Sequence, residues 1–554
     1  MKKEYVKYTY EAVGVAVIVA LGAAMRLAAL KGYGLADVFS DEARIALGAA
    51  TILKDKFLVL DYLRPQEPPL SMYLAAISMK LFGGGLHAAN LAPAISNIVS
   101  LLLIYGAGRL MFSHGAGLAA AGLAALLPAH ITRSVVLYEN CFTTFFAAAL
   151  LFCRVAYEKR NRRAWLCAAG LFAGLGLSTN LVFLYVMAAF AAALLSSGGL
   201  KTLLSDRRAL VFSAVFFVIG ALPVIADVAL NQRMLPTIFA HAGTEAMPGT
   251  ALEAAGMVWA RLAMAEDMFS VALRFGVVLW AIHCAASWRL DRRFVFLVVY
   301  LAAFIVMSIV THSGLHEHHL MSATPFAVLI PGSLIWIIER RLPRFEAVPA
   351  LLVLVVCVGV FAVRYSDPDY ARRGDEERNR EFVASIEGLD AGNTISADIG
   401  MTMLLHYKKY LETGITPGPL DAGIVSDLCN RFRACPVRED MLALDMLFRQ
   451  RLKKYGMCAR CENRRTYGFN DIAECRAVFE RLVLELAYER GGCNFVICRG
   501  NDPANVFFDA AVFFETSIKN LESRGMLSID ERTARRSYTE CTIYEAETPK
   551  KLQR

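Results

Sequence analysis

Charged residues are scarce in this sequence. Only 19% of its 554 residues are Asp, Glu, Lys or Arg, whereas soluble domains contain about 25%. Hydrophobic residues make up 56% of the chain, and long runs without charge fill residues 12–363. This balance excludes a purely soluble enzyme, a disordered protein and a small secreted scaffold, and it indicates a membrane protein that spans the bilayer many times.

Several motifs of soluble proteins are absent as well. Residues 364–554 contain neither a nucleotide-binding glycine motif nor a nucleophile elbow. The formal net charge is +8, but many of the basic residues stand in short clusters between apolar runs and form no continuous basic stripe. We therefore expect no nucleic acid partner.

The apolar runs predict a polytopic α-helical membrane protein. A transmembrane helix needs about 20 mostly apolar residues, and about eleven segments are candidates. We interpret the first of them as a retained anchor, because further spans follow it and no clean cleavage site does. The segments are 12–30, 88–108, 115–130, 137–156, 164–178, 181–196, 209–226, 270–288, 294–310, 320–338 and 347–363.

Lys and Arg residues indicate the orientation. With the N-terminus inside, the internal segments carry 18 basic residues, whereas the three short external turns carry only Arg133. The positive-inside rule then places the N-terminus inside and the C-terminus outside. Residues 31–87 form the first external loop. Within this loop, residues 69–83 are apolar but short, and they contain Lys80, so we expect them to lie at the interface as a helix.

Two domains are expected. Residues 1–363 form the membrane domain, and residues 364–554 form an extracytoplasmic α/β domain. The whole chain is expected in the plasma (inner) membrane of a cell envelope. In the second domain, helix-like segments alternate with strand-like ones: helical at 375–388, 400–411 and 506–522, and extended at 393–398, 494–497 and 541–545.

The cysteines divide between these domains. Five lie in or beside the apolar helices, where a thiol usually serves packing. The predicted extracytoplasmic domain contains eight, and an even number outside the cytoplasm favours disulfides. A zinc site that uses Cys458 and Cys461 with another pair is the alternative. The sequence does not determine the pairing.

The first candidate site residues follow the first span. Ser40 can cap an amphipathic helix that runs to about Leu53, with Asp41 and Glu42 in its first turn. Carboxylates in the first external loop can serve as bases. Acids at a helix start also stabilise the helix through its dipole, by about 0.3–1 kcal/mol, so a structural role stays open.

A second pair flanks an external turn. Arg133 lies in the turn 131–136 between the third and fourth predicted spans, and Glu139 lies at the mouth of the fourth. His130 just before them can be a helix-end residue and nothing more. An ionisable residue at the mouth of an apolar helix is costly and usually faces a cavity or a partner. A side chain that reaches the interface is the alternative explanation.

Histidines and a proline segment complete the candidates. His316, His318 and His319 lie between two spans, and their spacing does not match the HExxH zinc motif. Three histidines in four residues fit phosphate binding or metal coordination. Arg64 precedes the paired prolines Pro68 and Pro69, which fix an extended entry into residues 69–83 and can equally be a rigid turn.

Together these segments resemble the polyprenyl-phosphate-sugar glycosyltransferases of the GT-C fold class, similar to protein O-mannosyltransferases and bacterial aminoarabinose–lipid A transferases. The resemblance rests on an Asp-Glu pair soon after the first span, a Pro-Pro-Leu segment that opens a short interfacial helix, and an acid after the third span. The matching stretches are DEARIALGAATILKDKF (41–57), EPPLSMYLAAISMKLFG (67–83), GRLMFSHGAGLAAAGLAALLPAHITRSVVLYEN (108–140) and HHLMSATP (318–325).

The chain also departs from that family. Many bacterial members have a lysine in the turn that here reads Ser178-Thr179-Asn180. The cysteine-rich C-terminal domain has no counterpart that we can match. The identity of the acceptor therefore does not follow from the resemblance.

The resemblance implies a donor in which a sugar is joined to a polyprenyl phosphate and is used at the extracytoplasmic face. It implies Asp41 as the general base of an inverting transfer. Glu42 and Glu139 would orient the acceptor or help to bind a divalent metal ion, with Asp41 and Glu139 as candidate ligands. The candidates for the donor phosphate are Arg64, Arg133, His318 and His319.

The transferred sugar, a hexose or a pentose, and the acceptor, a protein, a lipid or another glycan, stay open. So do two other functions, a lipid or solute transporter and a non-catalytic subunit that keeps the fold. Transporters usually have paired halves with broken helices near the bilayer midplane, whereas the candidate groups here gather at the outer mouth. A subunit would bind polyprenyl phosphate without turning over a sugar.

Overall fold

The computed structural model divides into two compact units. The first comprises Met1–Gly32, Lys56–Gly83 and His87–Arg373, and the second comprises Tyr33–Asp55, Gly84–Leu86 and Gly374–Arg554. The structure describes residues 2–54 except 36, 37 and 39, residues 69–199 except 139, and residues 206–231, 291–310, 321–341, 347–365, 383–386, 389, 394–396, 404, 407, 408, 410–413, 480, 493–500, 518–536 and 539–547.

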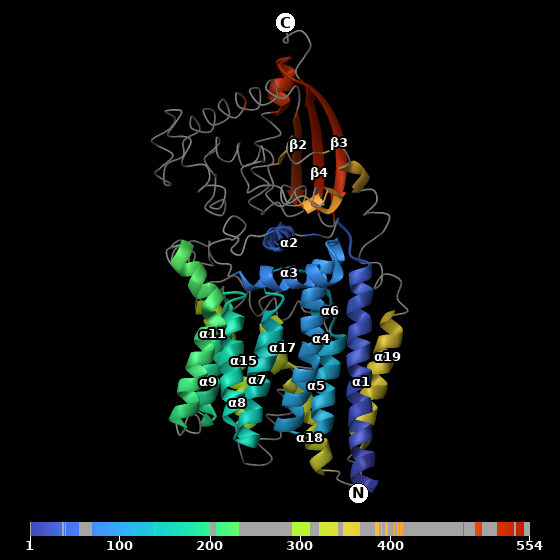
Figure 1. Cartoon of the computed structure of the whole chain (residues 1–554). Helices are drawn as coiled ribbons and strands as arrows, with labels where there is room; N and C mark the ends of the chain where they lie inside the picture. The colour runs from blue at the N-terminus through green and yellow to red at the C-terminus, as the bar shows by residue number, and fades with distance from the viewer. Residues whose placement is uncertain are drawn as a thin grey trace. The chain divides into compact units, whose positions relative to one another are not determined.

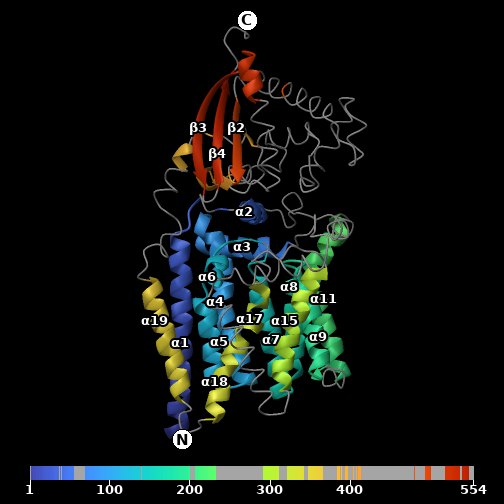
Figure 2. The same cartoon turned by 180° about the vertical axis from the view of Figure 1, so that it is seen from behind.

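The first unit is a helical bundle (Figure 1). Its described helices are α1 (Lys2–Lys31), α3 (Leu70–Phe82), α4 (Leu86–Met111), α5 (His114–Leu126), α6 (Pro128–Ser134), α7 (Thr143–Arg160), α8 (Arg163–Leu177), α9 (Phe183–Ser196), α11 (Arg207–Asn231), α15 (Arg292–Val310), α17 (Thr324–Ala327), α18 (Leu329–Arg341) and α19 (Ala347–Tyr365). Seen from behind, α8, α9, α11 and α15 form one side of the bundle (Figure 2).

Several of the predicted spans are helices in the structure. Among the described residues, four helices are long and apolar enough to cross a membrane: Glu11–Lys31, His87–Met111, Arg207–Ala226 and Met321–Arg341. The shorter helices α7, α8, α9, α15 and α19 lie on five further predicted segments. The predicted span 270–288 lies outside the described residues.

The third predicted span is interrupted. Helix α5 ends at Leu126 and α6 begins at Pro128, so the prediction of one helix over 115–130 was wrong. A proline disfavours helical geometry in the residue before it, and Leu127 is extended, with φ −65° and ψ 116°. Helix α6 then occupies most of the predicted turn 131–136, and α7 starts at Thr143.

Small residues let the helices around α5 approach closely. A Cβ atom on Gly108 of α4 would lie 2.8 Å from the Cα atom of Gly117 in α5. One on Gly332 of α18 would lie 2.9 Å from the Ala116 carbonyl oxygen. Close backbone approach of this kind is typical of helices that pack within a membrane, and α5 is buried along nearly its whole length.

Helix α3 lies across one end of the bundle and not alongside the other helices (Figure 1). The Leu70 amide donates to the Ser178 carbonyl oxygen at 3.1 Å, so the start of α3 is fixed to the turn between α8 and α9. One face is buried, with Met72 and Met79, whereas Leu81 is 70% exposed. A short helix with apolar residues on its exposed face suits an interface with lipid.

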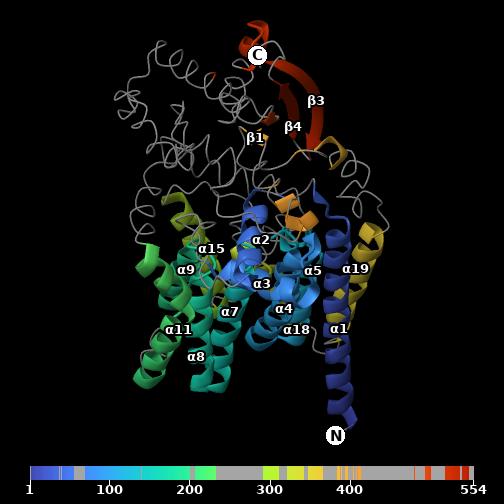
Figure 3. The same cartoon turned by 45° about the horizontal axis from the view of Figure 1, so that its top comes forward.

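The second unit contains a four-stranded sheet in the order β1-β2-β4-β3; β1, β4 and β3 are labelled in Figure 3. Its strands are β1 (Thr394–Ser396), β2 (Cys493–Gly500), β3 (Ser528–Arg536) and β4 (Thr539–Glu547). Strand β1 is parallel to β2, and the other pairs are antiparallel. Three strands lie where the sequence predicts them. Strand β3, which the sequence did not predict, is an edge strand rich in charge, a composition that protects an exposed edge but hides the strand pattern.

Candidate functional site

Helix α2 (Ser40–Leu53) carries the acidic pair and belongs to the second unit. It begins at Ser40, so Asp41 and Glu42 occupy its first turn, as the sequence predicts. Residues 42–51 are all buried, so α2 lies in an interior. Its charged side chains Glu42 and Arg44 are buried together with its apolar ones.

Glu42 is the buried acid of this turn, with 1% of its surface exposed. The Tyr33 hydroxyl donates a hydrogen bond to its Oε2 atom. Burial and the neighbouring Glu42 carboxylate both raise the pKa of Tyr407 well above its ordinary value. A buried carboxylate is costly unless it is hydrogen-bonded, and the Tyr33 hydroxyl supplies Glu42 with such a bond.

A second polar group lies in the first unit. Arg26 of α1 is fully buried and donates to the carbonyl oxygens of Ala124 and Ala125 at the end of α5, each at 3.3 Å. Its Nη2 atom lies 2.5 Å from Nδ1 of His130 in α6. The terminal carbonyls of a helix have no partner within the helix, and the Arg26 guanidinium satisfies them.

Arg133 is the predicted phosphate ligand that the structure describes. It lies in the last turn of α6 and is half-buried, one turn beyond His130. Asp41 and Glu42 belong to the second unit and Arg133 to the first. The predicted site residues Arg64, Glu139, His318 and His319 lie outside the described residues.

Asn140 follows Glu139 and was missed by sequence reasoning. It is 1% exposed, and neither its Oδ1 nor its Nδ2 atom has a hydrogen-bond partner among the residues that the structure describes. Nearby, the Asn97 amide donates to the carbonyl oxygens of Cys141 at 3.0 Å and Pro93 at 2.9 Å. Buried amides are normally satisfied, and an amide inside an apolar segment was the signal available in the sequence.

Arg26 and the tyrosines were also missed. A lone arginine in the apolar run 12–30 is itself a signal, because a charge inside a span is costly and usually functional or structural. Tyr33 carries no such signal. Tyr407 carries none either, because it lies hundreds of positions from Glu42 in the sequence. His130, interpreted as a helix-end residue, is near the end of α6 and contacts Arg26.

The metal and disulfide predictions are not tested by the described residues. Among these residues, no three His, Cys, Asp or Glu side chains are grouped as a metal site requires. Glu139, one of the two candidate ligands, lies outside them. In the described part of the chain, the membrane-domain cysteines Cys141, Cys153, Cys167 and Cys357 form no disulfide.

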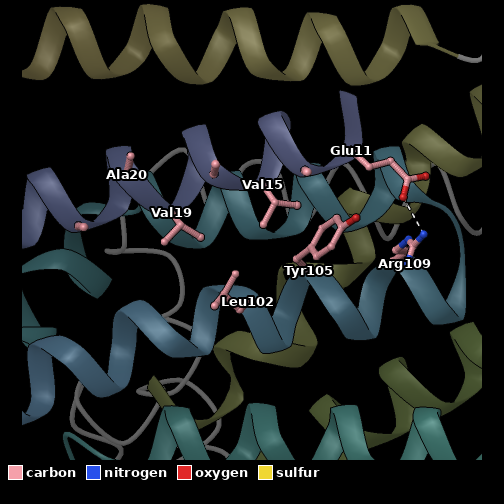
Figure 4. Close-up of a pocket in the computed structure, with 10 residues that line it drawn as sticks. Glu11, Val15, Val19, Ala20, Leu102, Tyr105 and Arg109 are labelled. Carbon is pink, nitrogen blue, oxygen red and sulfur yellow. Dashed lines mark hydrogen bonds and ion pairs between the residues drawn. The ribbon is translucent and has the colours of Figure 1, made fainter. Parts of the chain in front are cut away.

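A groove between α1 and α4 lies in the first unit, whereas the acidic pair belongs to the second (Figure 4). It has a volume of about 720 Å³ and is lined mainly by apolar side chains of both helices, among them Val15, Val19 and Leu102. At one end, Arg109 pairs with Glu11 at 2.6 Å. This ion pair neutralises both charges, so the groove suits an apolar chain more than a reacting sugar.

Comparisons with known proteins give the class of this fold. The family described as dolichyl-phosphate-mannose-protein mannosyltransferase matches residues 66–226. Together with the solved structures below, this match confirms the resemblance to GT-C glycosyltransferases of the polyprenyl-phosphate-sugar type, and the apolar helices make the chain an integral membrane protein. No curated protein matches the sequence.

The particular similarity is to ArnT from Cupriavidus metallidurans. The structure of ArnT bound to undecaprenyl phosphate has a TM-score of 0.61 at 13% identity, and the match covers 96% of this chain and 97% of that chain. The apo structure has a TM-score of 0.56 at 14% identity and covers 97% and 98%. At this identity, the similarity establishes the fold, and the activity has to be argued from the residues.

Proposed function

We propose that the protein is a membrane glycosyltransferase that moves a sugar from a polyprenyl-phosphate donor to an acceptor at the extracytoplasmic face, with inversion at the anomeric carbon. The observation that carries the proposal is the similarity in fold to ArnT over nearly the whole chain, combined with an acidic pair in the first turn of α2. ArnT was solved with undecaprenyl phosphate, which supports a donor of that chemical class here.

The proposed reaction needs one base and one cationic site. The acceptor hydroxyl attacks the anomeric carbon, and its proton passes to the Asp41 carboxylate. The bond between the anomeric carbon and the phosphate oxygen breaks, and polyprenyl phosphate leaves with the bonding electron pair. The leaving group is already an anion of low basicity, so it needs cations and no proton.

The proposed roles divide between the residues as follows. Glu42, buried and hydrogen-bonded, is suited to hold a fixed negative charge beside Asp41 and to orient the acceptor. Glu139 is assigned the same orienting role and, with Asp41, the binding of a divalent ion if one takes part. The donor phosphate is assigned to Arg133, Arg64, His318 and His319.

Orientation follows from the positive-inside pattern and stays part of the proposal. The N-terminus is placed inside, and residues 364–554 are placed outside the plasma membrane, as an α/β domain on the side where the sugar is transferred. The crosswise helix α3 supports an interfacial position for residues 69–83. The acceptor is a protein, a lipid or another glycan.

The experiment is sugar release from a radiolabelled pool of polyprenyl-phosphate sugars by the purified protein, compared with Asp41→Asn. We expect turnover by the wild type and a loss of about 10²–10⁴-fold in the variant, the usual contribution of a general base. Asp206→Asn is a matched control, since Asp206 pairs with Arg163 on an exposed turn. A parallel sample treated with a chelator tests the divalent ion.

Each outcome decides between the functions. Near-wild-type transfer by a folded Asp41→Asn protein would remove Asp41 as the base. Binding of polyprenyl phosphate by the wild type without release of sugar would favour the non-catalytic subunit. Movement of the labelled lipid or sugar across a sealed vesicle without transfer would favour a transporter.

A further inference from the structure

The acidic first turn of α2 is built into the C-terminal part of the protein. Residues Tyr33–Asp55 pack as one compact unit with Gly84–Leu86 and Gly374–Arg554, although they are far apart in sequence. The segment proposed to carry the base therefore belongs to the same compact unit as the C-terminal part of the chain.

Two tyrosines act on the buried carboxylate. Tyr33 lies just before α2, and its hydroxyl donates to Glu42. Tyr407 comes from the C-terminal half, is 1% exposed, and lies close enough to Glu42 for the carboxylate to affect the ionisation of its phenol. The Tyr407 ring stacks on Tyr410 with their centroids 6.2 Å apart and their planes 9° apart.

Tyr410 contacts the third segment of the unit, Gly84–Leu86. A Cβ atom on Gly84 would lie 3.2 Å from the Tyr410 hydroxyl oxygen. The backbone just before α4 therefore passes directly against this phenol. The Tyr410 phenol therefore lies against the Gly84 backbone, and the buried Tyr407 ring stacked on it lies near enough to Glu42 for the carboxylate charge to act on its phenol.

We propose that Tyr407, together with Tyr33, is a positioning residue of the transferase: the two phenols fix the Glu42 carboxylate, and thereby the first turn of α2 that contains Asp41. The inference rests on the proposed function, and it makes the C-terminal half a working part of the site. Neither tyrosine touches the reacting atoms. Both act through Glu42.

The physical reason is preorganisation. A buried carboxylate without hydrogen-bond donors would turn toward water and carry the first turn of its helix with it. A misplacement of about 1 Å at a reacting group can cost on the order of 10²-fold in rate. Substrate binding would be affected less, because the donor phosphate is assigned to other residues.

The test uses Tyr407→Phe and Tyr33→Phe in the full-length protein, which remove only the hydroxyls. We expect kcat for sugar transfer to fall about 10–100-fold while the KM for the donor stays unchanged. In a Glu42→Gln background, the further effect of Tyr407→Phe should shrink, because residues that act through one group are not additive. Tyr157→Phe, which removes the hydroxyl of a buried tyrosine packed with Leu166 and Ala209 in the first unit, is the matched control.

A second readout does not depend on activity. Amide hydrogen exchange of α2, residues 40–53, should become about 2–10-fold faster in Tyr33→Phe and Tyr407→Phe, the effect of losing one ordinary hydrogen bond. Wild-type turnover and wild-type exchange in both variants would overturn the positioning role. Faster exchange in a protein that transfers no sugar at all would leave the positioning role in place and overturn the proposed function.

Discussion

The two units hold their buried charges in different ways. In the bundle, Arg26 is bound by main-chain carbonyls of α5 and by one histidine of the next helix. In the second unit, Glu42 accepts a hydrogen bond from the Tyr33 side chain, and Tyr407 of the C-terminal half lies near enough for the Glu42 charge to act on its phenol. Main-chain partners persist under most substitutions, whereas side-chain partners can be lost singly. The bundle is therefore a robust scaffold, and the acidic turn is sensitive to remote changes.

The largest effect on stability should come from Arg26→Met. The substitution leaves the Ala124 and Ala125 carbonyls and His130 without this donor. A buried polar group left unsatisfied costs about 1–3 kcal/mol, and we expect a total loss of about 3–5 kcal/mol in the free energy of unfolding. Equilibrium unfolding in mixed detergent micelles measures it.

The control for that prediction is Arg163→Met. Arg163 is 56% exposed and pairs with Asp206, and exposed pairs contribute about 0–1 kcal/mol. Equal losses of unfolding free energy for both arginines would mean that the carbonyl contacts of Arg26 contribute little. Main-chain contacts would then not distinguish the bundle from the second unit.

The two units also differ in how much of their structure could be predicted from the sequence. The apolar runs predicted most of the bundle, because a span is a local pattern of about 20 residues. The break at Pro128 was visible in the sequence and was overlooked. The acidic pair at the start of α2 was predicted because capping residues and first-turn acids are local too.

The rest of the site was not predictable for a physical reason. The contact between Tyr407 and Glu42 depends on how two distant segments pack, and no periodicity in the sequence encodes it. Arg26 was accessible as a lone charge in an apolar run, but its partners at the end of α5 depend on the bundle. Strand β3 was missed because its charges conceal the alternation of a strand.

The next prediction concerns the cysteines of the second unit. Cys498 of β2 and Cys541 of β4 stand opposite each other in the antiparallel register. Residues in such positions have Cα atoms about 4.5–5.5 Å apart, within the range that a disulfide requires. If the domain faces an oxidising compartment, we expect this pair to be joined, with the two electrons passing to a thiol–disulfide oxidant of that compartment.

Peptide mapping under non-reducing conditions should recover the fragment that links Cys498 to Cys541. Replacing both by serine should cost about 2–4 kcal/mol of unfolding free energy. A mapped pair that joins either cysteine to another partner, or zinc in the purified protein bound through Cys458 and Cys461, would contradict the prediction. A confirmed link would sharpen the contrast with the free thiols of the bundle.

A smaller effect is expected from Gly117→Ala in α5. A Cβ atom there would lie 2.6 Å from the Tyr105 carbonyl oxygen of α4, so the two helices must separate. Overpacking of this kind costs about 1–3 kcal/mol. Gly359→Ala in α19 is the control, because no atom of the described neighbouring residues lies within 4 Å of its Cβ position. Alanine there should be neutral or stabilising by up to about 1 kcal/mol. Unfolding midpoints that fall equally would show that close backbone approach does not stabilise the bundle.

The smallest effect tests a side-chain pair at the start of α15. Burial opposes ionisation of Asp291, but the Arg293 guanidinium, which donates to Oδ1 at 2.9 Å and Oδ2 at 2.5 Å, outweighs it and lowers the pKa of the carboxyl. A lowered pKa in the folded state means that the pair stabilises the protein above the unfolded pKa of about 3.9. This stability is lost as the pH falls through the lower, folded value.

The contribution at neutral pH should be less than about 1 kcal/mol, because the pair is partly exposed. We expect Asp291→Asn to lower Tm slightly at pH 7 and to match the wild type once the pH is below the folded pKa. Thermal unfolding followed at a series of pH values measures this convergence. A difference in Tm that persists unchanged into strong acid would mean that Asp291 acts through packing and not through its charge. Such a side-chain pair would then be as insensitive to pH as the main-chain contacts of the bundle.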